Sequence, residues 1–73
     1  MEIEFLEIVG NGICTVCGHG EENGQTFGWS VLYNEDTHKL VGKLTVSPKR
    51  YYIGQKVRRI LPALIKVRLA ECS

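Results

Sequence analysis

The stretch from Ile13 to Gly20 constrains the fold of this 73-residue chain more than any other. It contains Cys14 and Cys17, separated by two residues, with a glycine directly after the second cysteine. This pattern is typical of a zinc knuckle, in which a tight turn points both sulfurs to one side and the glycine relieves crowding near the thiolates. In so short a chain, a metal bound here would organise the whole topology.

A structural zinc site needs four ligands, almost always cysteine or histidine, so this stretch is half of a site. His19 can fold back toward Cys17, and Cys72 near the end of the chain can reach the same point. His38 is a poor candidate, because an intervening strand at about 3.3 Å per residue would carry it about 25 Å away. The best ligand set is therefore Cys14, Cys17, His19 and Cys72. The alternative is that the cysteines are reduced thiols in a turn.

Length and composition indicate one small domain, residues 1–73. A chain of this size buries only about 60% of its unfolded surface, so we expect added support from a metal, a partner or self-association. Three cysteines cannot all pair within one chain, and we expect no secretory segment at its start. No apolar run approaches the roughly 18 residues that a membrane span requires. These features predict a cytoplasmic protein with reduced thiols and no membrane partner.

Alternating apolar and polar residues predict an antiparallel sheet. Residues 1–9 alternate as a strand, and residues 13–17 form a short apolar segment after a glycine-rich turn. The next residues, 18–25, contain three glycines and predict a loop. Residues 26–33 and 38–46 alternate on either side of a short polar turn, which predicts a β-hairpin.

A helix is expected after the hairpin. Ser47 suits the N-cap and Pro48 the first helical position, and apolar residues then recur at spacings of three and four. Pro62 predicts a helix end near Leu61, and residues 63–71 fit either a final strand or further helix. The sequence thus predicts a small single α+β domain, with a three- or four-stranded antiparallel sheet, a C-terminal helix and zinc as a candidate staple.

Charge is divided unequally between the two halves of the chain. Residues 1–36 contain seven acids and no lysine or arginine, whereas residues 37–73 contain all nine basic residues and one acid. The halves therefore carry −7 and +8. Such asymmetry indicates a surface that binds a polyanion or an acidic protein. The alternative is that the halves neutralise each other across a compact fold.

No motif for catalysis is present. The glycines lack the spacing of a phosphate-binding loop, and no serine, histidine and acid form a recognisable motif. We therefore expect no enzyme and no small-molecule substrate. Arginine and tyrosine suit phosphate contact, base stacking and protein interfaces. The candidate partner-binding residues are Lys49, Arg50, Tyr51, Lys56, Arg58 and Arg59, with Glu2 and Glu4 of the acidic first strand.

The chain as a whole resembles the small transcription regulators of lytic Xanthomonas bacteriophages, through its Met1–Phe5 opening, its Cys14-Thr15-Val16-Cys17 segment and its length. The resemblance implies a non-catalytic protein that binds bacterial RNA polymerase in the host cytoplasm, inhibits initiation and promotes antitermination. It supplies no motif from which binding residues could be transferred. The alternative function is a zinc-ribbon-like nucleic-acid-binding module, and nucleic acid near the polymerase is a candidate second partner.

Overall fold

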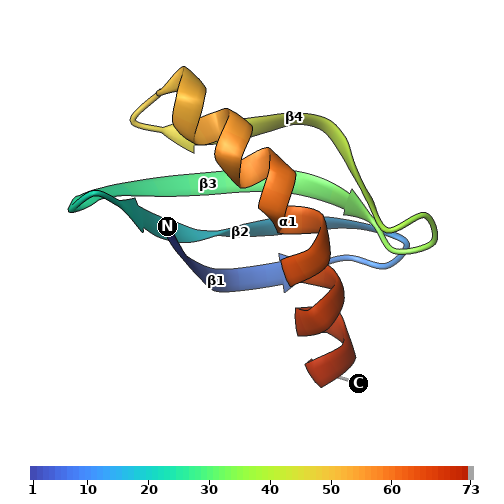
Figure 1. Cartoon of the computed structure of the whole chain (residues 1–73). Coiled ribbons are helices and arrows are strands. Elements are labelled where there is room, and N and C mark those ends of the chain that lie inside the picture. The colour runs from blue at the N-terminus through green and yellow to red at the C-terminus, as the bar shows by residue number, and fades with distance from the viewer. Residues whose placement is uncertain (73) are drawn as a thin grey trace.

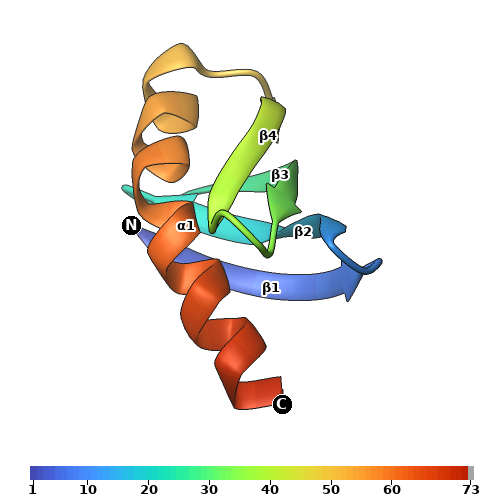
Figure 2. The same ribbon diagram turned by 90° about the vertical axis from the view of Figure 1, so that its right-hand side faces the viewer.

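The computed structural model describes residues 1–72, apart from the side chains of Tyr51 and Cys72. Within these residues, four strands precede one helix: β1 (Glu2–Val9), β2 (Ile13–Glu22), β3 (Gln25–Asn34), β4 (Lys39–Ser47) and α1 (Tyr51–Cys72). The strands form one antiparallel sheet in the order β1-β2-β3-β4, and α1 crosses one face of it (Figure 1, Figure 2). The predicted α+β class, with an antiparallel sheet and a C-terminal helix, is confirmed.

The core lies between α1 and the sheet face that it covers, which we call the inner face. Alternate residues of β3, from Phe27 to Tyr33, are buried on this face. Four apolar side chains of α1, from Ile53 to Ile65, are fully buried at intervals of four residues, as expected for one stripe of a helix. The core cluster consists of Cys14, Val16, Phe27, Trp29, Val31, Tyr33, Val46, Ile53, Val57, Leu61 and Ile65.

The loop predicted after Cys17 is instead the second half of β2, so that prediction is wrong for most of its length. Gly18 and Gly20 lie on the inner face, opposite Trp29 and Phe27 of β3. A Cβ atom added to Gly18 would lie 2.7 Å from Trp29 Cζ2, and one added to Gly20 would collide with Phe27 Cζ. The glycines therefore make room for aromatic rings within a sheet and do not shape a metal-binding turn.

The helix begins later than predicted. The Gly54 amide donates to the Arg50 carbonyl at 3.0 Å, which places Arg50 at the start of the helical hydrogen-bond pattern. Ser47 is instead the last residue of β4, and the Ser47–Pro48 peptide bond is cis. The prediction that Ser47 caps the helix is therefore wrong.

The helix also ends later than predicted, because it continues through Pro62. The structure decides the open question for residues 63–71, which are helical. A proline inside a helix costs about 3 kcal/mol. Leu61 and Ile65, on either side of it, are both fully buried, and each burial contributes about 1.5–3 kcal/mol. Among the described residues, no helix has the length and apolar content that a membrane span requires.

Replacing Gly18 with alanine should destabilise the fold by about 1–3 kcal/mol, because the new methyl group overlaps the Trp29 ring and the Glu4 carbonyl oxygen. Gly28→Ala is the matched control, since it also lies within a strand but a Cβ there comes no closer than 3.9 Å to surrounding atoms. Urea unfolding followed by Trp29 fluorescence measures both variants. Equal unfolding midpoints for the two would contradict the packing role of Gly18.

Candidate functional site

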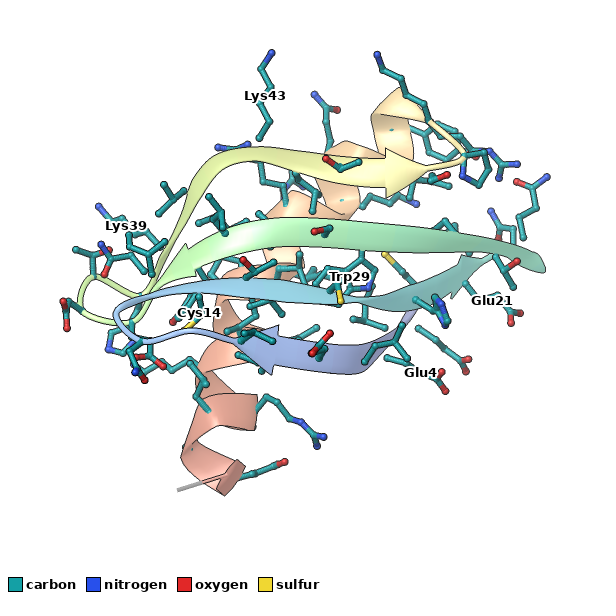
Figure 3. The ribbon with its side chains drawn as sticks, turned by 180° about the vertical axis from the view of Figure 1, so that it is seen from behind. Glu4, Cys14, Glu21, Trp29, Lys39 and Lys43 are labelled. Atoms are coloured by element: carbon teal, nitrogen blue, oxygen red, sulfur yellow. The ribbon has the colours of Figure 1, made fainter. Side chains whose placement is uncertain are left out.

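Cys14 and Cys17 lie on opposite faces of β2, because side chains three positions apart in a strand point in opposite directions. Cys14 is buried in the core, and its thiol donates to the Gly10 carbonyl at 3.4 Å (Figure 3). Burial, together with the hydrogen bond and negative charge of Glu35, raises the pKa of the Cys14 thiol. Because zinc is bound by the thiolate, this raised pKa increases the cost of releasing the Cys14 proton to a metal.

The other predicted metal ligands are not gathered around Cys14 either. Cys17 is half-buried and His19 is exposed, and both belong to the opposite, outer face of the sheet. The side chain of Cys72 lies outside the described part of the chain. Among the described side chains, no three or more histidine, cysteine or acidic residues are close enough to hold a metal ion. Zinc binding stays a prediction, which metal analysis of the purified protein would test.

Three glutamates lie close together at one end of the outer face. In the β1–β2 ladder Glu2 is opposite Glu21 and Glu4 is opposite His19, and Figure 3 shows Glu4 and Glu21 at the same end of the sheet. They line an open hollow of about 590 Å³, which we call the acidic hollow. Its lining is Glu2, Glu4, His19, Gly20, Glu21, Thr26, Phe27, Gly28, Ser47 and Pro48. Like charges on paired strands repel, so these carboxylates favour a cationic partner.

A second hollow, of about 500 Å³, lies between β4 and the first turns of α1, and we call it the basic groove. Its lining is Lys43, Leu44, Thr45, Val46, Lys49, Arg50, Gly54, Gln55 and Arg58, which includes four cations and no carboxylate. Arg50 donates to the Gln25 side chain, and Arg58 donates to the Gly42 carbonyl at 3.2 Å. Two of the four cations are therefore held in place by hydrogen bonds to the sheet and its turns.

These two surfaces contain five of the eight predicted partner-binding residues: Lys49, Arg50, Arg58, Glu2 and Glu4. Lys56 lies outside them and forms an ion pair with Glu22 at 3.4 Å. Arg59 is exposed and lines neither surface, and the side chain of Tyr51 lies outside the described residues.

Sequence reasoning missed Lys43 of the basic groove and Glu21 of the acidic hollow. A signal for Glu21 was present in the dipeptide Asn23-Gly24, because Asn-Gly is the strongest short hairpin signal. Both residues have positive φ angles, 53° and 77°, as that type of turn requires. The turn brings Glu21 into register with Thr26 and so places it in the sheet beside β1.

The acidic hollow and the basic groove meet at the connection between β4 and α1. Ser47 and Pro48 line the hollow, and Lys49 and Arg50 line the groove. One end of the molecule therefore presents carboxylates on one side of this connection and cations on the other. Comparisons with protein-family models, curated proteins and solved structures find no match for this chain.

In a Cys72→Ser chain, Cys17 should react with an aromatic disulfide reagent at pH 8, while Cys14 should not react until the protein unfolds. Burial shields the Cys14 thiol, and its raised pKa keeps it protonated. The absorbance of the released thiolate should report one thiol per folded chain and a second in concentrated guanidinium. Equal reaction rates for both thiols in the folded protein would contradict this arrangement.

Stability should fall at alkaline pH because two buried groups hold their protons more tightly when folded. Burial, followed by the charges of Glu35 and Cys14, raises the pKa of Tyr33, and the pKa of Cys14 is raised as described above. Their stabilising effect is complete below the unfolded values, 9.0 for Cys14 and 10.0 for Tyr33, and is lost as pH rises through the folded values. Each group lowers the free energy of unfolding by up to about 1.4 kcal/mol per pH unit.

Urea unfolding at pH 7 to 11 measures this effect, with a Cys14→Ala chain as the comparison. The loss of stability should begin near pH 9 in the parent chain and about one unit higher in the variant, since the variant retains only Tyr33. A midpoint that does not change up to pH 11 would contradict the prediction.

Proposed function

We propose that this chain is a non-catalytic transcription regulator that binds bacterial RNA polymerase in the cytoplasm of the host cell. It would inhibit initiation and promote antitermination by occupying a surface of the enzyme. The observation that carries the proposal is the placement of the acidic hollow and the basic groove on either side of one connection, residues 47–50. The resemblance of the sequence supplies the identity of the partner.

Two opposite charges at one end of a small domain favour one orientation on a large partner. A partner surface with a basic region beside an acidic one would match both, whereas a rotated or incorrect surface would place like charges together. Such mismatches cost several kcal/mol, so paired charges provide specificity and a fast association rate more than raw affinity. RNA polymerase, a large enzyme that also holds nucleic acid, can offer acidic protein surface or phosphate to the basic groove.

The charges at this end are held before any partner arrives. The Arg50 side chain donates to Gln25 and the Arg58 side chain donates to the Gly42 carbonyl at 3.2 Å, so two cations of the basic groove are held against the sheet. Hydrogen bonds of this kind add only about 0.5–1.5 kcal/mol each to stability. They do restrict long side chains, which lowers the entropic cost of binding by about 0.5–1.5 kcal/mol for each side chain already immobilised.

A second candidate function, a nucleic-acid-binding module, is favoured by the composition of the basic groove. Four cations and no carboxylate surround an open hollow beside the first turns of α1. Neutralising several phosphates releases counterions, so binding by such a groove would weaken steeply as the salt concentration rises. The acidic hollow beside it would repel the phosphate backbone, which makes this the weaker of the two candidates.

Reversing charge on either surface should weaken binding to RNA polymerase holoenzyme by about tenfold, because each change removes a favourable contact and adds a repulsive one. The two test chains are Lys43→Glu with Lys49→Glu, and Glu2→Lys with Glu4→Lys. Lys39→Glu with Lys66→Glu is the control, since it makes the same double reversal of lysines at exposed positions outside both surfaces. Affinity is measured from the binding of each chain to surface-immobilised polymerase. Inhibition is measured from the amount of transcript initiated at a promoter in vitro.

Failure of the parent chain to bind polymerase would overturn the proposal. The nucleic-acid-binding module would then be supported if the parent chain binds a DNA or RNA oligonucleotide. That binding should weaken as the salt concentration rises and should be absent from the chain with Lys43→Glu and Lys49→Glu.

A further inference from the structure

The outer edge of β1 is open for pairing with another strand. Within residues 1–72, β1 pairs with β2 and lies at the end of the strand order. The Glu2 and Glu4 carbonyl oxygens point toward β2, where a Cβ atom added to Gly20 or Gly18 would collide with them. Because successive residues of a strand direct their backbone groups to opposite sides, Ile3 and Phe5 direct theirs toward the free edge. A strand edge of this kind is a template for β-strand addition.

The helix extends past this edge. A helix of 22 residues is about 33 Å long. Four strands at about 4.8 Å spacing span only about 14 Å between the outermost strand axes. Figure 1 and Figure 2 show the C-terminal turns of α1 continuing beyond β1. If a fifth strand were added beside β1, the side chains on its inner face would therefore lie next to the C-terminal turns of α1.

An apolar surface lies between the start of β1 and the overhanging part of α1. Ile60, Ala63, Leu64 and Val67 follow one another at helical spacing, beside the buried stripe. Leu64 is 38% exposed and Val67 is 57% exposed, which leaves apolar area open at this position. A hollow of about 500 Å³ is lined by Met1, Ile3, Ile60, Ala63 and Leu64.

We propose that the β1 edge binds an extended segment of a partner protein in which apolar and basic residues alternate. The added strand would pair with residues 2–5, because the register of β1 shifts between Phe5 and Glu7 and ends the regular stretch there. Its apolar side chains would enter the hollow beside Ile3. Its lysines or arginines would lie on the outer face, where Glu2 and Glu4 are exposed.

Charge argues against a second copy of this chain as the occupant. Pairing of β1 with another β1 would place Glu2 and Glu4 of one copy against the same residues of the other, and like charges across paired strands are destabilising. Pairing of β1 with β4 of another copy is limited by the irregular register of β4, where Gly42 has a φ of 71°. The β1 edge would bind a segment of this chemistry in any protein that carries it.

The test uses a synthetic peptide of four Lys-Val repeats, acetylated and amidated, titrated into the ¹⁵N-labelled chain. The peptide should bind with a Kd below about 1 mM. At saturation, hydrogen exchange of the Ile3 and Phe5 amides should slow at least tenfold while that of β4 amides stays the same. The matched peptide of Glu-Val repeats should not bind. Binding of both peptides alike, or protection of β4 instead of β1, would overturn the proposal.

Backbone methylation separates strand addition from simple charge attraction. Only one of the two alternating sets of peptide amides can face β1, so N-methylation of that set should abolish binding and N-methylation of the other set should change it less than threefold. Equal effects of the two methylated peptides would overturn strand addition.

Two substitutions test the contribution of the hollow. Leu64→Gln should weaken binding of the Lys-Val peptide about fivefold, because it puts a polar group where the peptide's valines lie. Leu32→Gln is the matched control on the outer face, where Leu32 is 41% exposed, and it should leave binding unchanged. Equal weakening by both, or an effect of neither, would overturn the assignment of the hollow. Circular dichroism of each variant confirms that it is folded.

Discussion

Packing of the Trp29 indole on the inner face joins three of the four strands. The ring lies against Gly18 of β2 and meets Phe5 of β1 edge-on, with ring centroids 5.4 Å apart and an interplanar angle of 88°. Its Nε1–H donates to the His19 carbonyl at 3.0 Å. Aromatic pairs in this geometry contribute about 0.5–1.5 kcal/mol beyond their buried area, and a satisfied indole N–H avoids a cost of about 1–3 kcal/mol. Without glycine at position 18 the ring could not occupy this space.

The same packing explains why the charged side chains lie at the surface and away from the inner face of the sheet. The inner face is filled by aromatic rings and by the apolar stripe of α1, and no described polar or charged residue is buried. All described ionised groups therefore lie on the outer face, the edges, the turns or the exposed side of α1. The carboxylates of the acidic hollow come from β1 and β2, and the cations of the basic groove come from β4, α1 and the connection between them. Because the strands run antiparallel, β4 ends at the end of the sheet where β1 begins, and this places the cations around the start of α1 beside the acidic hollow.

The parts of the fold that were predictable depend on local periodicity. The hairpin of β3 and β4 was predictable because inward and outward side chains alternate with a period of two, and the helix was predictable from its spacing of three and four. The second half of β2 was missed because its inward positions after Val16 are Gly18 and Gly20, which carry no apolar side chain. The continuation of α1 through Pro62 was missed because helix propensity is local, whereas the burial that offsets it is tertiary.

The sequence by itself determined the class of the fold, the presence of one C-terminal helix and the division of charge along the chain, because these follow from patterns between residues close in sequence. Only the tertiary structure decided where the cysteines and charges lie. The extended conformation of β2 placed Cys14 and Cys17 on opposite faces, and the antiparallel return of β4 placed Lys49 near the acidic end. A shift of one residue in register would move every side chain of a strand to the other face, and Gly18 and Gly20 carry no apolar side chain that would mark the inner face of β2 in the sequence.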